Sequence, residues 1–536
     1  MGETLSLDPG ASATFAGLLL PKTTLTLSTG NPSARIQVTI ELDQRAALSR
    51  VFEPEAEAWV LPADFHGFAR VTFTSLGLEN ATRQSPVRLK TELTTRRAGS
   101  TPSTRASERI AAKNVILYVV DTVRWDQVGE SGATSSNAPN LHALAETATF
   151  FANARAQAPW TRASVASMLT GLRPWRHRAN AGGERLADSL DTLAEVLAEA
   201  GLTTAAFTTN GNVAPSLGFA QGFDHFDYLR EHGPKIHVPA DALHGRVLQW
   251  LGTLSEDQNF FLWIHATDPH APYTPDSQPS SGIDEAARLR LRSTEFLMQI
   301  YKSRKELPGP ELEHLLDLYG AEVRAWDAEL GRLMAALVER QLLAETLLIV
   351  VADHGEEFFD HGGWQHSTSV FEEVIKVPLV IRLPGAGPSD GRVTDHHAEH
   401  VDVFPTVLDV LDLPVNSDID GKSLLPYLRG EPADRLSPQI SSLETRQHVV
   451  AESIALYGHK LVRTWASGRH QSLALYDLTN DQRETTDLTS SKPIATEALR
   501  LLLEAATFSR SLGVESDPEQ LDPELASTLR VLGYVQ

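Results

Sequence analysis

The chain has 536 residues, of which 42% are apolar and 22% charged, a balance typical of globular proteins. It carries 47 Lys and Arg against 69 Asp and Glu, and a net charge of −22 disfavours binding to nucleic acids and anionic membrane surfaces. The absence of cysteine excludes disulfides, thiolate zinc sites, cysteine nucleophiles and any cofactor made from a cysteine.

The first 94 residues have the pattern of a β-sandwich. Their start shows no signal-peptide pattern, so we expect a cytoplasmic protein or one whose leader has been removed. Short β-branched or alternating runs separated by Gly, Pro and Asn predict strands. These runs are ATFAGLLL, TLTLST, ARIQVTIEL, EAWVLPA, FARVTFTSL and PVRLKTEL. Residues 95–112, rich in Ser, Thr and Arg, predict a linker, and we expect the sandwich to be separable from the rest of the chain.

Residues 113–437 alternate between predicted strands and helices. The apolar runs NVILYVVD, TTAAFTTN, FFLWIHATD and TLLIVVAD predict buried strands, and NLHALAETATFF predicts a helix. Leu186, Leu190, Leu193 and Leu197 stand at helical spacing and predict another helix, which Gly201 ends. This alternation predicts an α/β fold with a mostly parallel, doubly wound sheet. Residues 438–536 predict a C-terminal subdomain with a small antiparallel sheet and a helical tail. No apolar run is long enough to span a membrane.

Polar residues follow three of the predicted strands. Asp121 ends the first, Asp268 and His270 end another, and Asp353 and His354 end the last. Ligands of open parallel sheets bind beyond the carboxyl ends of the strands, where these residues would meet. A single Asp after a strand is often only a helix cap. Three such clusters with two histidines are more typical of a metal site, and imidazole with carboxylate suits zinc or manganese better than calcium or magnesium.

A candidate nucleophile lies in the segment APWTRASVASMLTG. Thr161 stands just before a predicted helix that runs to Gly171, and the free N–H groups of a helix start favour an anionic ester. Without the nearby Asp and His residues, Thr161 would be interpreted as a helix cap with a structural role only. A metal ion bound to the hydroxyl would turn it into a usable nucleophile.

The motifs together resemble the sulfatase branch of the alkaline phosphatase superfamily. The resemblance rests on NVILYVVDTVRWDQVG, APNLHALAETATFFANARAQAPWTRASVASMLTGLRP and VVADHGEEFFDHGGWQHSTSVFEEVIKVPLVIRLPG, with closing segments such as LYDLTNDQRETTDL. It covers roughly residues 113–536, and residues 1–94 lie outside it. The resemblance implies an α/β/α core with a C-terminal β subdomain and hydrolysis of an anionic ester.

The nucleophile segment departs from the sulfatase pattern. Sulfatases carry Cys or Ser in a C/S-x-P-x-R motif, and that residue is oxidised to formylglycine; here Thr161 fills its slot, with Ala163 and Val165 for the Pro and Arg. Threonine cannot become that aldehyde, so we expect no formylglycine. Thr161 is similar instead to the nucleophile of the nucleotide pyrophosphatase/phosphodiesterase, phosphoethanolamine transferase and lipoteichoic acid synthase branches.

The resemblance implies one or two divalent metal ions. The first would be held by Asp121, Thr161, Asp353 and His354. A second ion would be held by Asp268, His270 and His366. Alternatively, His270 and His366 act as catalytic residues that contact the ester oxygens.

Three further residues have two interpretations each. Asn210 is a candidate for binding the substrate ester or a turn residue, and Arg124 is a candidate for binding a negative leaving group or a partner in a surface ion pair. His265 lies inside a predicted strand and is interpreted as a core histidine with satisfied hydrogen bonds rather than a ligand.

The sequence therefore predicts a metal-dependent hydrolase or transferase of anionic esters, with phosphodiester or phosphonate substrates favoured and a covalent phospho-threonine intermediate. One alternative is a sulfatase that uses unmodified Thr161. The other is a non-catalytic binding protein on a decayed sulfatase core. The sequence indicates neither the leaving group nor the oligomeric state.

Overall fold

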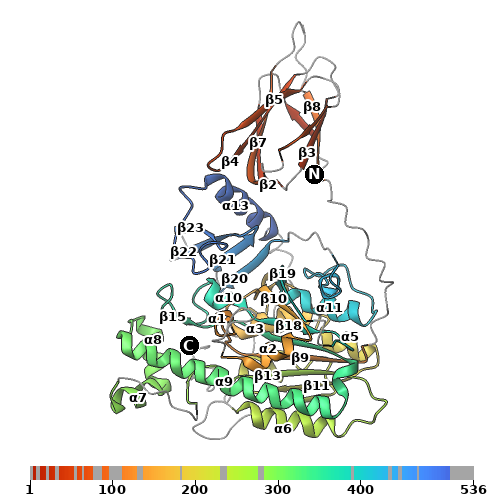
Figure 1. Cartoon of the computed structure of the whole chain (residues 1–536), viewed down its shortest axis with the longest axis vertical. Coiled ribbons are helices and arrows are strands. Elements are labelled where there is room, and N and C mark those ends of the chain that lie inside the picture. Colours follow the sequence, from red (N-terminus) through yellow and green to blue (C-terminus); the bar gives the residue numbers. More distant parts are fainter. Residues whose placement is uncertain are drawn as a thin grey trace. The chain divides into compact units, whose positions relative to one another are not determined.

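The structure is a computed structural model, shown in Figure 1, and the chain divides into two compact units. The larger unit spans Arg105–Ser453, Thr464–Gln471 and Arg510–Gln536, and the smaller unit comprises Met1–Thr104, Ile454–Arg463 and Ser472–Ser509. The residues that the structure describes are 4–7, 12–19, 23–29, 35–52, 57–62, 66–76, 87–95, 112–128, 137–180, 184–229, 238–275, 283–387, 391–431, 437–444, 449–466 and 470–507.

The larger unit is built on a mixed sheet that, in the described residues, has nine strands in the order β12-β11-β13-β9-β14-β18-β10-β17, with β19 beside β10. From β12 to β14 neighbouring strands are parallel, whereas β18 is antiparallel to β14 and to β10. The α/β fold with a mostly parallel sheet is thereby confirmed. The strands are β9 (Asn114–Val120), β10 (Thr149–Arg155), β11 (Thr203–Thr208), β12 (His225–Tyr228), β13 (Phe260–Ala266), β14 (Thr346–Ala352), β17 (Lys376–Val377), β18 (Leu379–Arg382) and β19 (Arg392–Glu399).

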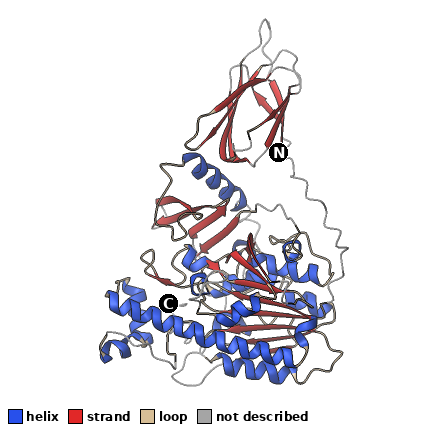
Figure 2. Cartoon of the chain, in the orientation of Figure 1, coloured by secondary structure: helices blue, strands red, loops and turns tan. Residues whose placement is uncertain are grey.

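Helices surround this sheet, as Figure 2 shows. They are α1 (Trp125–Val128), α2 (Pro139–Ala145), α3 (Thr161–Thr170), α4 (Pro174–His177), α5 (Leu193–Glu199), α6 (Ala240–Leu251), α7 (Glu285–Leu291), α8 (Thr294–Ser303), α9 (Gly309–Glu339), α10 (Glu372–Ile375), α11 (Val403–Val410) and α12 (Leu425–Leu428). Short 3₁₀ turns are η1 (Gly211–Val213), η2 (Pro215–Leu217), η3 (Leu342–Glu345) and η4 (His400–Asp402), and a small hairpin joins β15 (Glu357–Phe358) to β16 (Trp364–Gln365).

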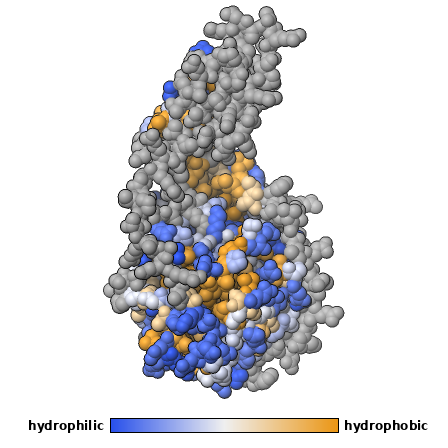
Figure 3. Space-filling model, turned by 90° about the vertical axis from the view of Figure 1, so that its right-hand side faces the viewer, coloured by the Kyte–Doolittle hydropathy of each residue, from blue (hydrophilic) through white to orange (hydrophobic). Residues whose placement is uncertain are grey.

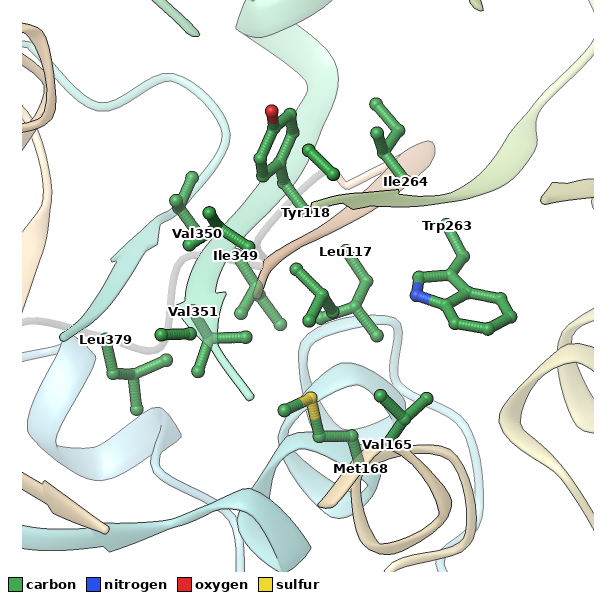
Figure 4. Close-up of a cluster of buried hydrophobic side chains, with 14 of the residues drawn as sticks. Leu117, Tyr118, Val165, Met168, Trp263, Ile264, Ile349, Val350, Val351 and Leu379 are labelled. Atoms are coloured by element: carbon green, nitrogen blue, oxygen red, sulfur yellow. The ribbon is translucent and has the colours of Figure 1, made fainter. Parts of the chain in front are cut away.

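Both faces of the sheet are buried, because side chains that alternate along β9 meet helices on opposite sides. Figure 4 shows Leu117 on the side of Val165 in α3 and Tyr118 on the other side. There the Tyr118 hydroxyl lies 3.0 Å from Nε2 of His244 in α6 and accepts a hydrogen bond from Trp326 of α9 at 3.1 Å. Val165, which replaces the sulfatase motif arginine, therefore lies in the apolar core.

Two helix predictions are wrong in their extent. The predicted helix over NLHALAETATFF ends at Ala145, and Thr149–Arg155 forms β10, because its Thr-Phe-Phe run favours a strand. Leu186 and Leu190 precede α5, which begins at Leu193 behind a capping box between Thr192 and Glu195. The predicted helix that runs to Gly171 is confirmed, but Thr161 is its first residue rather than the residue before it, and Gly171 takes the left-handed conformation that ends it.

In the smaller unit, the described N-terminal strands form two four-stranded antiparallel sheets, β1-β8-β3-β6 and β2-β7-β4-β5. One core contains Leu25 from the first sheet and Ile36, Val38 and Phe73 from the second. The strands are β1 (Thr4–Leu7), β2 (Ser12–Leu19), β3 (Thr23–Thr29), β4 (Ile36–Leu42), β5 (Leu48–Phe52), β6 (Glu57–Val60), β7 (Gly67–Ser75) and β8 (Val87–Thr95). Strands β1 and β5 were not predicted.

The C-terminal helix α13 (Pro493–Thr507) belongs to the same unit and contacts β2 and β7. Its apolar side chains, including Leu499 and Leu503, are buried. Asp43 accepts hydrogen bonds from the backbone N–H groups of Ile494 and Ala495, at 3.0 and 2.9 Å. The unit therefore joins segments that the sequence analysis assigns to separate N-terminal and C-terminal domains.

The predicted C-terminal strands HKLVRT and LALYDL fall in β22 (His459–Ala466) and β23 (His470–Asp477). With β20 (Gln439–Glu444) and β21 (Val449–Leu456) they form a four-stranded sheet in chain order. The end of the predicted tail, ELASTLRVLGYVQ, lies outside the described residues.

Hydrophilic and hydrophobic residues are interspersed over the coloured part of the face shown in Figure 3. Within the described ranges, we find no helix that combines the length and the apolar character needed to cross a membrane.

Candidate active site

The carboxyl ends of three adjacent parallel strands converge on one buried cluster. Asp121 follows β9, His265 lies near the end of β13, and Asp353 and His354 follow β14; all four side chains are 0% exposed. The backbone continues the ladder at this edge, because the Asp121 N–H donates to the Ala266 carbonyl and the Asp353 N–H to that of Val120. The sheet therefore fixes the spacing of the carboxylates and imidazoles.

Thr161 adds a hydroxyl to this cluster from the first residue of α3. Its Oγ1 lies 3.4 Å from Nε2 of His354. Asn210 Nδ2 donates to Asp121 Oδ2 at 2.5 Å and lies 3.4 Å from Thr161 Oγ1. The structure thus brings together the predicted residues Asp121, Thr161, Asn210, Asp353 and His354.

The cluster contains two carboxyl groups that burial disfavours as anions. Burial and the neighbouring Asp353 raise the pKa of Asp121 well above its usual value, and burial raises that of Asp353. Burial also lowers the pKa of His354 to about 3 and that of His265 to about 4, which keeps both imidazoles neutral. Neutral imidazoles cannot compensate two carboxylates, whereas a bound cation would favour their charged form.

The hydrogen-bonding pattern also fits a divalent cation. In the described part of the chain, Asp121 Oδ1, Asp353 Oδ2 and both ring nitrogens of His265 are buried without a hydrogen-bond partner. Asp121, His265 and Asp353 offer ligand atoms that all lie within 4.8 Å of one another. The interpretation of His265 as a core histidine with satisfied hydrogen bonds is therefore wrong.

His354 is oriented toward Thr161 by its backbone environment. Its Nδ1 lies 2.8 Å from the Gly355 carbonyl, a hydrogen bond that leaves Nε2 as the atom facing the cluster. The backbone at Gly355 packs directly against the Glu373 carbonyl, where a Cβ atom would clash. Glycine is therefore needed immediately after the Asp353–His354 pair.

The site extends from His354 to two further histidines, His366 and His270. The ring centroid of His366 lies 4.5 Å from that of His354 and 5.0 Å from that of His270. Glu356 Oε1 lies 2.8 Å from His366 Nδ1, and Glu356 Oε2 accepts a hydrogen bond from Tyr273 at 3.0 Å. Burial raises the pKa of Glu356 to about 8 and lowers that of His366 to about 4. Burial therefore disfavours the charged form of both side chains.

The structure does not bring Asp268 together with the two histidines of the predicted second metal site. Asp268 Oδ1 instead accepts a hydrogen bond from the Ala240 N–H at the start of α6, at 2.8 Å. Among the described residues, the potential metal-binding group of three or more side chains consists of Asp121, His265 and Asp353. Asp268 thus makes a tertiary hydrogen bond to the first residue of α6.

Arg124, the predicted contact for a leaving group, is buried and bonded within the protein. Its guanidinium donates to the carboxylates of Asp126 and Asp360 and to the Glu356 carbonyl, at distances from 2.7 to 3.2 Å. Burial lowers the pKa of Arg124, but the two carboxylates outweigh this effect and raise it. Any contact with substrate would require breaking some of these bonds.

A small pocket lies beyond His270. It is lined by His270, Ala271, Pro272, Thr294, Leu297, Met298 and Gln365. Its lining combines apolar side chains of α8 with the residue that precedes His366. The pocket therefore lies beside His270 and His366, which extend the series of ring contacts that starts at His354.

Two family profiles match the chain. The profile described as Sulfatase matches residues 113–413, which is more than half of the chain and contains the entire cluster. The chain belongs to the sulfatase family. A second profile, described as N-sulphoglucosamine sulphohydrolase, C-terminal, matches residues 360–506. The recognition of the sulfatase-like branch of the alkaline phosphatase superfamily is thereby confirmed, and with it a hydrolase of that superfamily.

Curated sulfatases show distant similarity to this family member. Arylsulfatase K of Gallus gallus is 25% identical over 322 residues, covering 51% of this chain and 59% of the relative. An arylsulfatase of Clostridium perfringens is 22% identical over 71% of this chain and 90% of its own length. Choline-sulfatase of Rhizobium meliloti is 23% identical over 59% of this chain and 72% of its own.

Solved structures share the sulfatase fold. One was determined in complex with its substrate D-glucosamine-2-N,6-O-disulfate; its TM-score is 0.62 at 20% identity, covering 76% of this chain and 99% of that one. The phosphonate monoester hydrolase of Agrobacterium radiobacter has a TM-score of 0.60 at 22% identity, covering 74% and 95%. The predicted fold class is confirmed.

His265, Glu356 and Tyr273 were not predicted to contribute to the site. Trp263 and His265 stand two positions apart in β13, so they share the face that Figure 4 shows directed toward α3. That periodicity places His265 on the side of Thr161 and could have indicated its position. Glu356 and Tyr273 meet across loops, and their sequence carries no comparable signal.

Proposed function

We propose that this sulfatase-family hydrolase acts on phosphodiester or phosphonate esters, with Thr161 as nucleophile and zinc or manganese as cofactor. The observation that carries the proposal is the position of the Thr161 hydroxyl, 3.4 Å from His354 Nε2 and beside a carboxylate cluster suited to a cation. Threonine in place of the formylglycine precursor argues against the usual sulfatase chemistry. The phosphonate monoester hydrolase neighbour indicates that the fold accommodates such substrates.

The metal would be held by Asp121, Thr161, Asp353 and His354. When bound, a divalent ion supplies charge neutralisation and lowers the pKa of the Thr161 hydroxyl. Imidazole ligation favours zinc or manganese over calcium, which prefers oxygen ligands only.

The remaining steps are carried out by side chains of the protein. Thr161 releases its hydroxyl proton to solvent, its Oγ1 forms a bond to phosphorus, and the bond from phosphorus to the leaving oxygen breaks. Asn210 Nδ2, adjacent to Thr161 Oγ1, can donate a hydrogen bond to an ester oxygen. His270 or His366 assists the leaving oxygen, which takes up a proton. The oxygen of water, or of an acceptor alcohol in a transferase, then forms a bond to phosphorus and loses its proton. The bond between phosphorus and Thr161 Oγ1 breaks, and Oγ1 takes up a proton to restore the hydroxyl.

A substrate panel tests this proposal. The same 4-nitrophenyl leaving group is presented as a phosphate monoester, phosphate diester, phosphonate monoester and sulfate, with zinc, manganese, magnesium or calcium. We expect the diester or the phosphonate with zinc or manganese to be turned over fastest. Acid quenching and peptide mass spectrometry should then detect Thr161 carrying the phosphoryl ester or phosphonyl group that remains after the 4-nitrophenol has left.

Two alternatives give different results in the same experiment. A sulfatase that uses unmodified Thr161 would hydrolyse the sulfate ester fastest. A non-catalytic binding protein would turn over none of the four esters with any metal.

A further inference from the structure

His265 is a buried histidine whose ring makes no hydrogen bond. It is 0% exposed, and neither Nδ1 nor Nε2 has a partner in the described part of the structure. Other buried histidines of the chain do bond: His177 Nε2 lies 3.1 Å from the Ser167 hydroxyl, and His400 Nε2 lies 3.0 Å from the Ala352 carbonyl. Buried polar groups normally have partners, so the two unpartnered ring nitrogens of His265 indicate a ligand-binding role.

Carboxylate oxygens lie near Nε2 of His265, at distances that do not suit hydrogen bonds. Nε2 lies 3.7 Å from Asp353 Oδ2 and 3.9 Å from Asp121 Oδ2, beyond the usual range of about 2.7–3.2 Å. His354 Nε2 approaches the same pair, 3.5 Å from Asp353 Oδ2 and 3.7 Å from Asp121 Oδ1. Two imidazoles thus face two carboxylates without direct bonds.

These separations fit ligands around a common cation. Zinc bonds of about 2.0–2.1 Å in a tetrahedral site place neighbouring ligand atoms roughly 3.4 Å apart. The four separations from 3.5 to 3.9 Å are slightly longer than that value. Asp121, His265 and Asp353 already offer ligand atoms within 4.8 Å of one another, and His354 Nε2 lies within 3.7 Å of both carboxylates.

We infer that His265 is a ligand of the catalytic metal, which is then held by two imidazoles and two carboxylates in addition to Thr161. The inference rests on the proposed function only in assuming that this cluster binds a divalent ion. It adds a ligand from β13 to the set that the family resemblance implies. A second imidazole shifts the preference of the site further toward zinc and away from calcium.

X-ray absorption spectroscopy of the zinc-loaded, full-length protein tests this inference directly. Imidazole rings give a characteristic outer-shell scattering, and we expect the spectrum to require two of them per zinc ion. A spectrum that requires a single imidazole would overturn the inference while leaving the proposed metal-dependent function intact. Failure of the protein to bind zinc or manganese at all would overturn both.

Substitution provides the second measurement. In His265→Ala, competition with a chelator should show zinc affinity weakened by more than about tenfold, since even loss of outer-shell partners costs that much. His244→Ala is the matched control, because His244 is also buried but bonds to Tyr118 on the opposite face of the sheet. Its zinc affinity should be unchanged. Equal affinities in the two variants would contradict the role of His265. If either variant fails to fold, the X-ray absorption spectrum of the unmodified protein decides the question.

Discussion

Glu356 and His366 form a buried pair in which carboxylate Oε1 and ring Nδ1 are 2.8 Å apart. Both side chains are at most 5% exposed, so water does not compete for this contact. The pair fixes the ring of His366 beside His354 and gives Glu356 a positioning role.

Replacing Glu356 by leucine should therefore impair catalysis more than binding. We expect Glu356→Leu to lower kcat by about 10- to 100-fold, as for other residues that orient active-site ligands, with KM nearly unchanged. The loss should be larger for esters with poor alkyl leaving groups than for 4-nitrophenyl esters, because His366 lies where it can assist departure. Glu356→Gln can still bond to the ring and should recover most of the rate. Equal losses with both leaving groups would refute this role.

Thr161 is the residue on which the covalent mechanism depends. Thr161→Ala should reduce kcat by at least about a thousandfold, the usual effect of removing a nucleophile. The fold should persist, as measured by thermal unfolding. Thr170→Ala is the control, because it removes a buried hydroxyl from the same helix, one that bonds to the Ala166 carbonyl and to the Leu172 N–H. Near-normal turnover by Thr161→Ala would mean that water attacks directly.

Removal of the metal should affect stability in a pH-dependent way. Because the pKa of Asp121 is raised in the folded protein, the metal-free folded state holds a proton more tightly than the unfolded chain does. The resulting contribution to the stability of the folded state is present at low pH and is lost as the pH rises through the raised pKa. A bound cation removes the repulsion. We therefore expect zinc or manganese to raise Tm more at pH 8 than at pH 5, and calcium to have little effect. Elemental analysis that found stoichiometric calcium and no transition metal would contradict the assignment.

The pocket beyond His270 should affect the choice of leaving group. Met298 lines it from α8, so Met298→Glu should lower kcat/KM for aryl esters by about tenfold, roughly the effect of losing one good apolar contact. Methyl esters, whose leaving group is much smaller than an aryl group, should lose much less activity. Leu289→Glu places the same charge on α7 at a side chain that is 65% exposed, and serves as control. Identical behaviour of the two variants would show that the leaving group does not occupy this pocket.

Asp43 should stabilise the smaller unit through α13. Asp43→Ala removes the acceptor for two N–H groups at the helix start and should reduce the free energy of unfolding by about 1–2 kcal/mol. Urea denaturation monitored by circular dichroism measures this change. Deletion of the residues before Arg109 would expose the buried face of α13, and we expect that protein to aggregate. A soluble, fully active deletion variant would support the separable sandwich that the sequence predicts.

The sequence was sufficient to predict the residues that follow strands or begin a helix. Asp121, Asp353 and His354 were predictable because parallel strands place their carboxyl ends at one edge, and Thr161 because a glycine-terminated helix follows it. Contacts that depend on loop geometry were not predictable from the sequence. Asp268 has the same local pattern as Asp121, yet it bonds to the first residue of α6, and the direction of a side chain after a strand is set by tertiary packing.

The discontinuity of the smaller unit has a consequence for how the protein is made. Its N-terminal sheets leave the ribosome first, but α13, which covers β2 and β7, is synthesised only after the whole of the larger unit's sheet. During that interval the surface for α13 is open to water and to other nascent chains. Such exposed apolar surface is where chaperones bind and where aggregation begins, so the yield of folded protein should depend on how quickly the last part of the chain is translated.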